Sequence, residues 1–397
     1  MEQSKLFSIR LALLQSFLLQ NGYDGILLSR SDNYAMATGG RRNFIYTYSD
    51  VGANSLFVTK EGKAVFVGNT IESPRQRDEE LFDLPCEAPI EFLWFADSAA
   101  NAVRKKFAGN FVSDDGSLGP NVNGDLARLR AALTTYELEK YRHLGKLAAE
   151  AMCETLKSIS TGMTEADIAA RLVAEGWKRQ CHVPVVLVAA DERIARYRHP
   201  LPTVTPLLSN HASQNCVRTY VMVVGCFLRE GLVVSLTRFK KVREVSKEIH
   251  DAYCRICGVD ALVQEATLPG KTLGDVFAAC QQAYPALGFS VNEWHHHHQG
   301  GATGYAGRTC KGAPGESFPI VDPQWSKDVK NVLGEEVPFG MAFAWNPSAP
   351  GVKSEDTFIL LPDGTKEIVT ATPMLPQVDL AKVLGRNTEV GKSDISC

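Results

Sequence analysis

Four consecutive histidines, His295 to His298, lie within NEWHHHHQGGATGYAGRT at residues 292–309 of a chain that contains nine histidines. Imidazole titrates near neutrality, so such a run is suited to proton transfer, and imidazole also binds Zn, Ni or Cu. A metal site made by histidine alone needs three convergent rings. In an extended run alternate residues face opposite sides, so about two rings are expected to line a cavity. Acid/base work is therefore favoured, with a structural role and metal binding as the alternatives.

A fifth histidine and several arginines add to this chemistry. His199 lies in DERIARYRHPLPT, where Pro200 and Pro202 restrict the backbone around it. Arg308 follows two glycines in GYAGRT and is a candidate for holding a substrate carboxylate in fork geometry. GGRRNF at residues 39–44 supplies Arg41 and Arg42, which form either an exposed turn or a further anion contact.

Composition limits the classes of partner. Hydrophobic residues make up 45% and charged residues 22% of the 397 residues, with a formal net charge of −3, as in ordinary globular proteins. This charge gives no reason to expect nucleic acid or a membrane surface as a partner. The first residues lack the pattern of a signal peptide, and the ten cysteines are dispersed, so we expect a cytoplasmic protein.

Two domains and a tail must position these residues. Residues 1–133 alternate helix, strand and hairpin, including SLFVTKEGKAVFVGN with its Glu61-Gly62 turn, which predicts a smaller α/β domain. Residues 134–375 begin with a capping box, Thr134 with Glu137, and a long helix. Helix pairs followed by antiparallel-type strands then predict an α+β domain with helices on one sheet face. Residues 376–397 are polar and are expected to be a loosely held tail.

The second domain resembles the creatinase/prolidase/aminopeptidase P family, whose catalytic domain has the pita-bread fold. The resemblance rests on ELEKYRHLGKLAAEAM, GMTEADIAARL, RHPLPT, GLVVSLTRF, HHHHQGGATGYAGRT, PFGMAFAWNPS and GVKSEDTFILL, which occur in the family's order over about residues 134–372. It implies an α+β pita-bread domain behind a creatinase-type N-terminal domain. It also implies a homodimer.

The family's metallopeptidases hold two metals with two Asp, one His and two Glu, and most of these residues are absent here. The two Asp positions correspond to Val223 or Val224 and to Ser235, and the first Glu position is Asn346. The second Glu position is Glu355, while either His297 or Gln299 matches the histidine. A dinuclear metal site is therefore not expected, and no cofactor is predicted.

Creatinase is the metal-free branch of the family and implies roles for several residues. Its acid/base histidine matches His199, and its substrate-carboxylate arginine matches Arg308, while Thr237 and Asn346 replace its guanidinium-binding carboxylates. Arg41 or Arg42 would reach the site of a second subunit. The candidate catalytic residues are His199, His295, His297, His298 and Glu355, and the candidate substrate-binding residues are Arg41, Arg42, Ser235, Thr237, Gln299, Tyr305, Arg308 and Asn346.

The sequence therefore predicts a metal-independent, creatinase-like hydrolase that cleaves an amide or ureido C–N bond in a small molecule bearing a carboxylate. A metal-dependent Xaa-Pro aminopeptidase or prolidase is one alternative. A metal-free lyase or isomerase, or a non-catalytic binding protein on the same fold, is the other.

Overall fold

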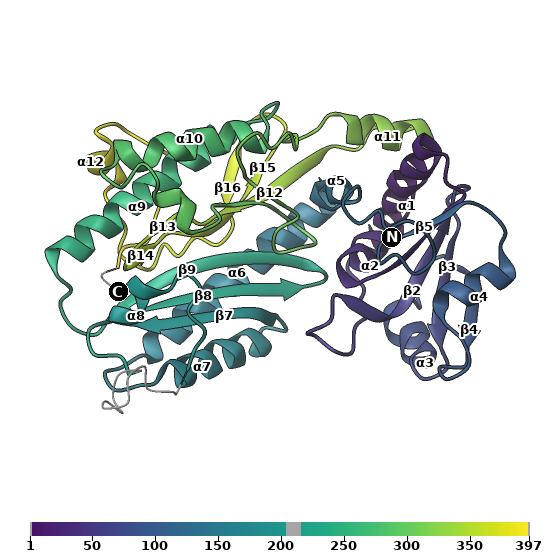
Figure 1. Ribbon diagram of the computed structural model, residues 1–397, viewed down its shortest axis with the longest axis horizontal. Helices are drawn as coiled ribbons and strands as arrows, with labels where there is room; N and C mark the ends of the chain where they lie inside the picture. Colours follow the sequence, from purple (N-terminus) through teal and green to yellow (C-terminus); the bar gives the residue numbers. More distant parts are fainter. Residues whose placement is uncertain (1, 204–215, 396–397) are drawn as a thin grey trace.

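A mixed β-sheet covered by helices forms the N-terminal part of the computed structural model, which describes residues 2–203 and 216–395 (Figure 1). The sheet has the strand order β4-β3-β2-β1-β5. Its elements are α1 (Glu2–Asn21), β1 (Gly25–Arg30), α2 (Ser31–Thr38), β2 (Val51–Thr59), β3 (Ala64–Asn69), α3 (Ser73–Arg75), the π-helical turn η1 (Gln76–Glu80), β4 (Glu87–Phe92), α4 (Ala99–Lys106), β5 (Phe111–Ser113) and α5 (Ala127–Ala131).

Both faces of this sheet are buried, which explains the apolar composition of β1. Ile26 and Leu28 point into the main core, and Leu27 between them packs in a second core that includes Val103 of α4. β2 and β3 pair antiparallel, and Gly62 in the turn between them has a φ of +77°, which favours glycine. The predicted α/β domain and its hairpin are thus present.

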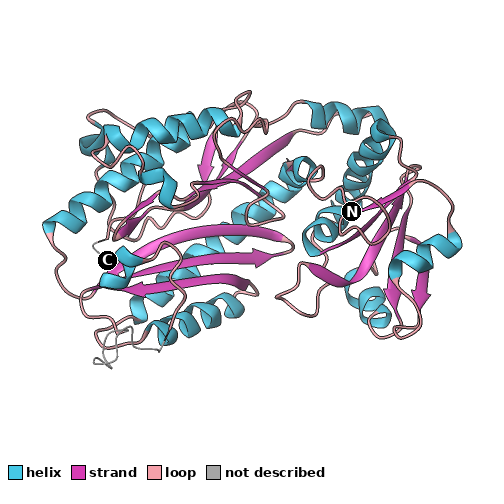
Figure 2. Ribbon diagram, in the orientation of Figure 1, coloured by secondary structure: helices cyan, strands magenta, loops and turns pink. Residues whose placement is uncertain are grey.

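The larger part of the chain has helices outside two sheets (Figure 2). Sheet β7-β8-β9 carries α6 and α7, and sheet β11-β10-β12-β15-β16 is covered by α9 and α10. The elements are β6 (Leu133–Thr134), α6 (Thr135–Ser158), α7 (Glu165–Lys178), β7 (His182–Ala190), α8 (Glu192–Arg196), β8 (Tyr220–Arg229), β9 (Leu232–Lys241), α9 (Lys247–Ala266), α10 (Leu273–Ala286), the 3-10 turn η2 (Glu293–His296), β10 (Gly300–Thr303), β11 (Cys310–Lys311), α11 (Gln324–Leu333), β12 (Phe339–Trp345), β13 (Ser348–Ala349), β14 (Val352–Lys353), β15 (Asp356–Leu360), β16 (Lys366–Ile368) and α12 (Leu380–Leu384).

Local signals fix several of these elements. Thr134 and Thr164 cap α6 and α7 through capping boxes with the third helical residue, and Thr272 caps α10 in the same way. Gly300 has a φ of +96°, and a Cβ there would lie 2.1 Å from the carbonyl oxygen of Ala344, so β10 passes close to β12 only with glycine. The arrangement is the α+β, pita-bread type that the sequence predicts.

The two parts of the chain are joined through a buried ion pair. Arg10 of α1 and Glu137 of α6 are both fully buried, and the Tyr305 hydroxyl also donates to Glu137. The expected boundary at residues 133/134 falls inside β6, which pairs with β12. α11 lies within the expected second domain but packs on α1 (Figure 1).

The expectation of a loosely held tail is wrong for the described part of residues 376–395. Lys392 is buried, and its ammonium lies 2.5 Å from Asp260 and 3.1 Å from Asp356. Ile395 is fully buried, and α12 packs on α9. The tail binds because two buried carboxylates from the core need its ammonium as a partner.

Among the described residues, none of the helices is both long and apolar enough to cross a membrane.

Candidate active site

The histidine run and His199 come from segments nearly a hundred residues apart, and an ion pair joins these segments. Arg198, next to His199, donates to Glu293 at 2.5 Å, and both side chains are mostly buried. Glu293 begins the 3-10 turn η2, which ends at His296, and His297 is then extended. The run is therefore not the uninterrupted extended segment that the sequence suggested, because the turn bends it between His296 and His297.

Three imidazole rings converge at this point. Nε2 of His297 lies 2.9 Å from Nε2 of His199. The ring of His298 stacks on that of His297 at 4.5 Å between centroids and lies 5.3 Å from that of His199. His295 and His296 are exposed, and His295 packs edge-on against Trp294 instead. The turn thus selects two neighbouring rings of the run and adds a third from a distant loop.

All three rings are held in the neutral form. Burial lowers the pKa of His297 far below its ordinary value, and Lys353 adds to this effect. Burial, with Arg308 and Lys311 nearby, lowers the pKa of His298 to about 3. The pKa of His199 is also lowered, first by burial and then by Lys353, although Glu355 opposes this. At neutral pH each ring therefore carries one N–H and one lone pair.

A second cluster surrounds Glu355, which is 2% exposed and precedes β15. Arg308 donates to Oε1 at 2.7 Å, and the ammonium of Lys353 lies 3.4 Å from Oε2. The Thr237 hydroxyl donates to Oε2 at 2.8 Å, and the Asn346 amide lies 3.4 Å from Oε1. Ser235 adjoins Arg308 at 3.4 Å. Five of the predicted residues, Ser235, Thr237, Arg308, Asn346 and Glu355, thus lie together.

Lys353 is the member of this cluster that sequence reasoning missed. Its side chain is 3% exposed. Burial by itself would raise the pKa of Glu355, but Lys353 and then Arg308 hold it at about 2. Two cations face one carboxylate, so the cluster has one positive charge in excess. The only signal in the sequence is a lysine two residues before Glu355 inside GVKSEDTF, which is indistinguishable from a surface lysine without the structure.

The residues at the family's metal positions do not fit a pair of divalent metals. Val223 and Val224 of β8 are buried hydrocarbon side chains, and Ser235 and Asn346 are neutral. Metal-bridging sites need several carboxylate oxygens. Here the single carboxylate, Glu355, is already neutralised by an ammonium and a guanidinium. These residues therefore do not supply the ligands of a dinuclear centre.

Two predicted substrate-binding residues have their polar atoms engaged within the protein. Gln299 is buried, accepts from the Tyr284 hydroxyl at 2.7 Å and donates to the backbone of His297. It thereby fixes the backbone that carries the His297 ring. Tyr305 donates to Glu137 at the junction between the two parts of the chain.

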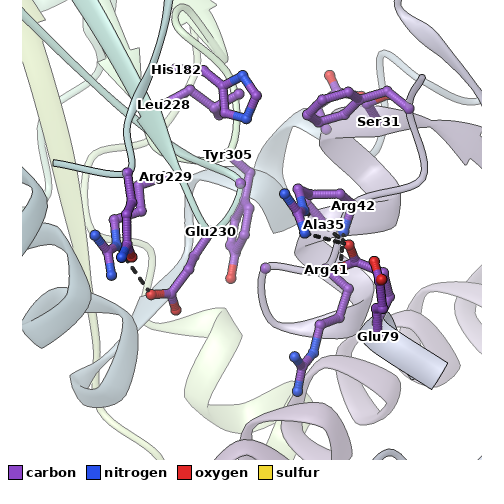
Figure 3. A pocket seen from close by; sticks show the side chains of 16 residues that line it. Ser31, Ala35, Arg41, Arg42, Glu79, His182, Leu228, Arg229, Glu230 and Tyr305 are labelled. Carbon is purple, nitrogen blue, oxygen red and sulfur yellow. Dashed lines mark hydrogen bonds and ion pairs between the residues drawn. The ribbon is translucent and has the colours of Figure 1, made fainter. Parts of the chain in front are cut away.

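Arg41 and Arg42 lie on the wall of a separate cavity of about 350 Å³ (Figure 3). Arg41 donates to Asp83 at 2.7 Å, and Arg42 pairs with Glu80 at 2.8 Å. His182, Glu230 and Tyr305 form the facing wall in Figure 3. The described residues that line this cavity include neither Arg308 nor the three clustered histidines, so a role in the site of a second subunit stays a prediction.

Arg308 also faces a larger cavity of about 780 Å³ between the two parts of the chain. Arg30, Asp50 and Arg130 line its N-terminal side, and Thr309 and Glu316 lie beside Arg308 on the other. A cavity of this size accommodates a small molecule. Arg308 therefore connects solvent-filled space with the Glu355 cluster.

The chain is similar to one family of known proteins over more than half of its length. Residues 139–359 match the model of the family described as metallopeptidase family M24. No curated protein is similar enough in sequence to be matched.

Solved structures share the fold of nearly the whole chain. A dipeptidase from Pyrococcus horikoshii OT3 has a TM-score of 0.68 at 17% identity, over 91% of this chain and 98% of that one. An Xaa-Pro dipeptidase from Bacillus anthracis has a TM-score of 0.63 at 17% identity, over 92% and 97%. The N-terminal domain of FACT complex subunit SPT16 from chickpea (Cicer arietinum) has a TM-score of 0.61 at 11% identity, over 96% and 98%.

Proposed function

The chain belongs to metallopeptidase family M24, and from that premise we propose that it is a metal-independent hydrolase of an amide or ureido C–N bond in a small molecule that bears a carboxylate. One observation carries the proposal. Glu355, the one carboxylate at the metal positions, is held by Lys353 and Arg308 within 3.4 Å. Charges that metals supply in such sites are here supplied by side chains.

The excess positive charge supports a carboxylate-bearing substrate. Arg308 reaches both the larger cavity and Glu355, and the buried Nε of its guanidinium has no hydrogen-bond partner among the residues that the structure describes. A substrate carboxylate in the cavity would gain a charge-assisted hydrogen bond from Arg308. The positive charge of Lys353, on the other oxygen of Glu355, would add to the attraction. Glu355 keeps the guanidinium in place while the anion binds.

The histidine pair supports acid/base catalysis. His199 is exposed and His297 is buried behind it, with 2.9 Å between the two Nε2 atoms. When His199 donates through Nε2, the lone pair on its Nδ1 is free to take a proton from an attacking water. The same proton can then be given to the leaving nitrogen. His297 acts as a positioning residue that fixes the His199 tautomer.

The experiment is a hydrolysis assay of N-acyl amino acids, ureido acids and Xaa-Pro dipeptides, each compared with its carboxyl methyl ester or amide. We expect at least one free acid to be cleaved and its neutral form to be cleaved at least tenfold more slowly, with the difference reduced in Arg308→Gln. Equal cleavage of acid and ester would contradict the anion-binding role of Arg308.

A non-catalytic binding protein is the second candidate, favoured by the likeness to the SPT16 domain, which spans 96% of this chain. That candidate predicts no turnover of any compound in the panel. His199→Ala would then change no rate, because neither protein would turn over any of these compounds.

A further inference from the structure

Three imidazoles that meet at one point are also the ligand set of a single divalent cation. His199, His297 and His298 each offer a ring nitrogen, and these three nitrogens all lie within 4.8 Å of one another. The Nε2 atoms of His199 and His297 are already 2.9 Å apart. Zn–N bonds of about 2.0–2.1 Å in tetrahedral geometry place ligand nitrogens roughly 3.4 Å apart. Small ring rotations therefore bring all three rings to bonding distance.

An unsatisfied buried nitrogen supports a ligand at this point. His297 is 8% exposed, and its buried Nδ1 has no hydrogen-bond partner among residues 2–203 and 216–395. Nδ1 of His298 is likewise buried and has no partner within the described part of the chain. Buried polar atoms are almost always paired. Nδ1 of His297 points in a different direction from the Nε2 that meets His199, so the unpaired atom that an ion at this point could satisfy is Nδ1 of His298.

We propose that His199, His297 and His298 form a binding site for one borderline divalent cation such as Zn²⁺ or Co²⁺, made of imidazoles alone and sharing at most His297 with the family's metal positions. Imidazole nitrogen suits these metals, and three protein ligands leave a fourth position open. Lys353, Arg308 and Lys311 act electrostatically on the rings and oppose a bare dication. They favour a bound cation whose fourth ligand is an anion, such as chloride or hydroxide.

A cation bound through Nε2 of His199 would place the remaining proton of this ring on Nδ1, the atom that accepts a proton in the proposed mechanism. Resting on the proposed function, this predicts that one equivalent of Zn²⁺ inhibits hydrolysis at least tenfold. The binding claim itself does not depend on that function, because it has a readout of its own.

The test is a titration of untagged, chelator-stripped protein with Co²⁺, followed by visible absorption and by calorimetry, and then displacement by Zn²⁺. We expect one equivalent of Co²⁺ to give the intense visible bands of a low-coordinate site, and His298→Ala and His199→Ala to weaken binding at least tenfold. The matched control is His296→Ala, an exposed member of the same run, which should bind as the wild type does.

Two outcomes would overturn the site. One is weak binding lost in His296→Ala but kept in His298→Ala, which would assign the cation to the exposed half of the run. The other is absence of any Co²⁺ binding to wild-type protein whose circular dichroism is native. Binding without inhibition would instead leave the cation site standing and count against the hydrolase proposal.

Discussion

The Nε2 atoms of His199 and His297 lie 2.9 Å apart although the two residues are 98 positions apart in the chain. His199 is exposed and His297 is buried. A proton taken up by His199 at the surface is therefore held on a ring that contacts the buried ring of His297. Because burial and nearby cations lower the pKa of both rings, the pair is neutral at pH 7 and is able to accept that proton.

Removing either ring of this pair should abolish most of the activity. General acid/base groups contribute about 10²–10⁴-fold to rate, so we expect His199→Ala to lower kcat within that range. His297→Asn, which lacks the ring, should lower kcat less than His199→Ala and shift the pH profile. His296→Ala is the control with wild-type kinetics. Equal kcat in His199→Ala and wild type would remove His199 from the mechanism.

Replacing Lys353 should destabilise the folded protein. Lys353→Met leaves Glu355 buried with Arg308 as its remaining cationic partner, at a cost of roughly 3 kcal/mol in the free energy of unfolding. The double variant Lys353→Met/Glu355→Gln removes the charge as well and should regain part of that loss. Urea denaturation at pH 7 measures both. A Lys353→Met protein as stable as the wild type would show that the ammonium does not hold Glu355.

The lowered pKa of Glu355 leads us to expect that the stability of the folded protein depends on pH. The pKa of this carboxyl is lowered from 4.5 to about 2 in the folded protein, mainly by Lys353 and Arg308 against the effect of burial. Its contribution is therefore present above pH 4.5 and is lost as the pH falls from there toward 2, by roughly 3 kcal/mol in all. Denaturation midpoints between pH 6 and 3 should fall less steeply for Glu355→Gln. Parallel curves for the two proteins would refute this.

The docked C-terminal segment gives a separate stability prediction. Lys392→Met leaves Asp260 and Asp356 buried without that ammonium, although Arg238 still contacts Asp356. We expect a loss of roughly 3–5 kcal/mol, seen as a lower thermal midpoint. Lys382→Met, in the same segment, is the control and should melt within about 1 °C of wild type. A stable Lys392→Met protein would mean that the tail is dispensable.

Local sequence was sufficient for the parts of the fold that depend on neighbours in the chain. The capping residue Thr134 and its partner Glu137 are three positions apart, so the start of α6 was predictable. The burial of Lys392 and of Lys353 was not predictable from the sequence. The fold brings their carboxylate partners to them, and a buried lysine has no local signature in the sequence. In the histidine run, the 3-10 turn rather than strand alternation determined which rings converge.

We propose that Lys353 and Arg308 take the place of metals around Glu355. The most direct test of this proposal is hydrolysis of the best substrate from the panel by chelator-treated protein whose metal content has been measured. We expect full kcat at less than about 0.05 equivalents of Mn, Co or Zn, and loss of activity in Lys353→Met. Activity that disappears with the metal and returns in proportion to added Mn²⁺, Co²⁺ or Zn²⁺ would contradict it.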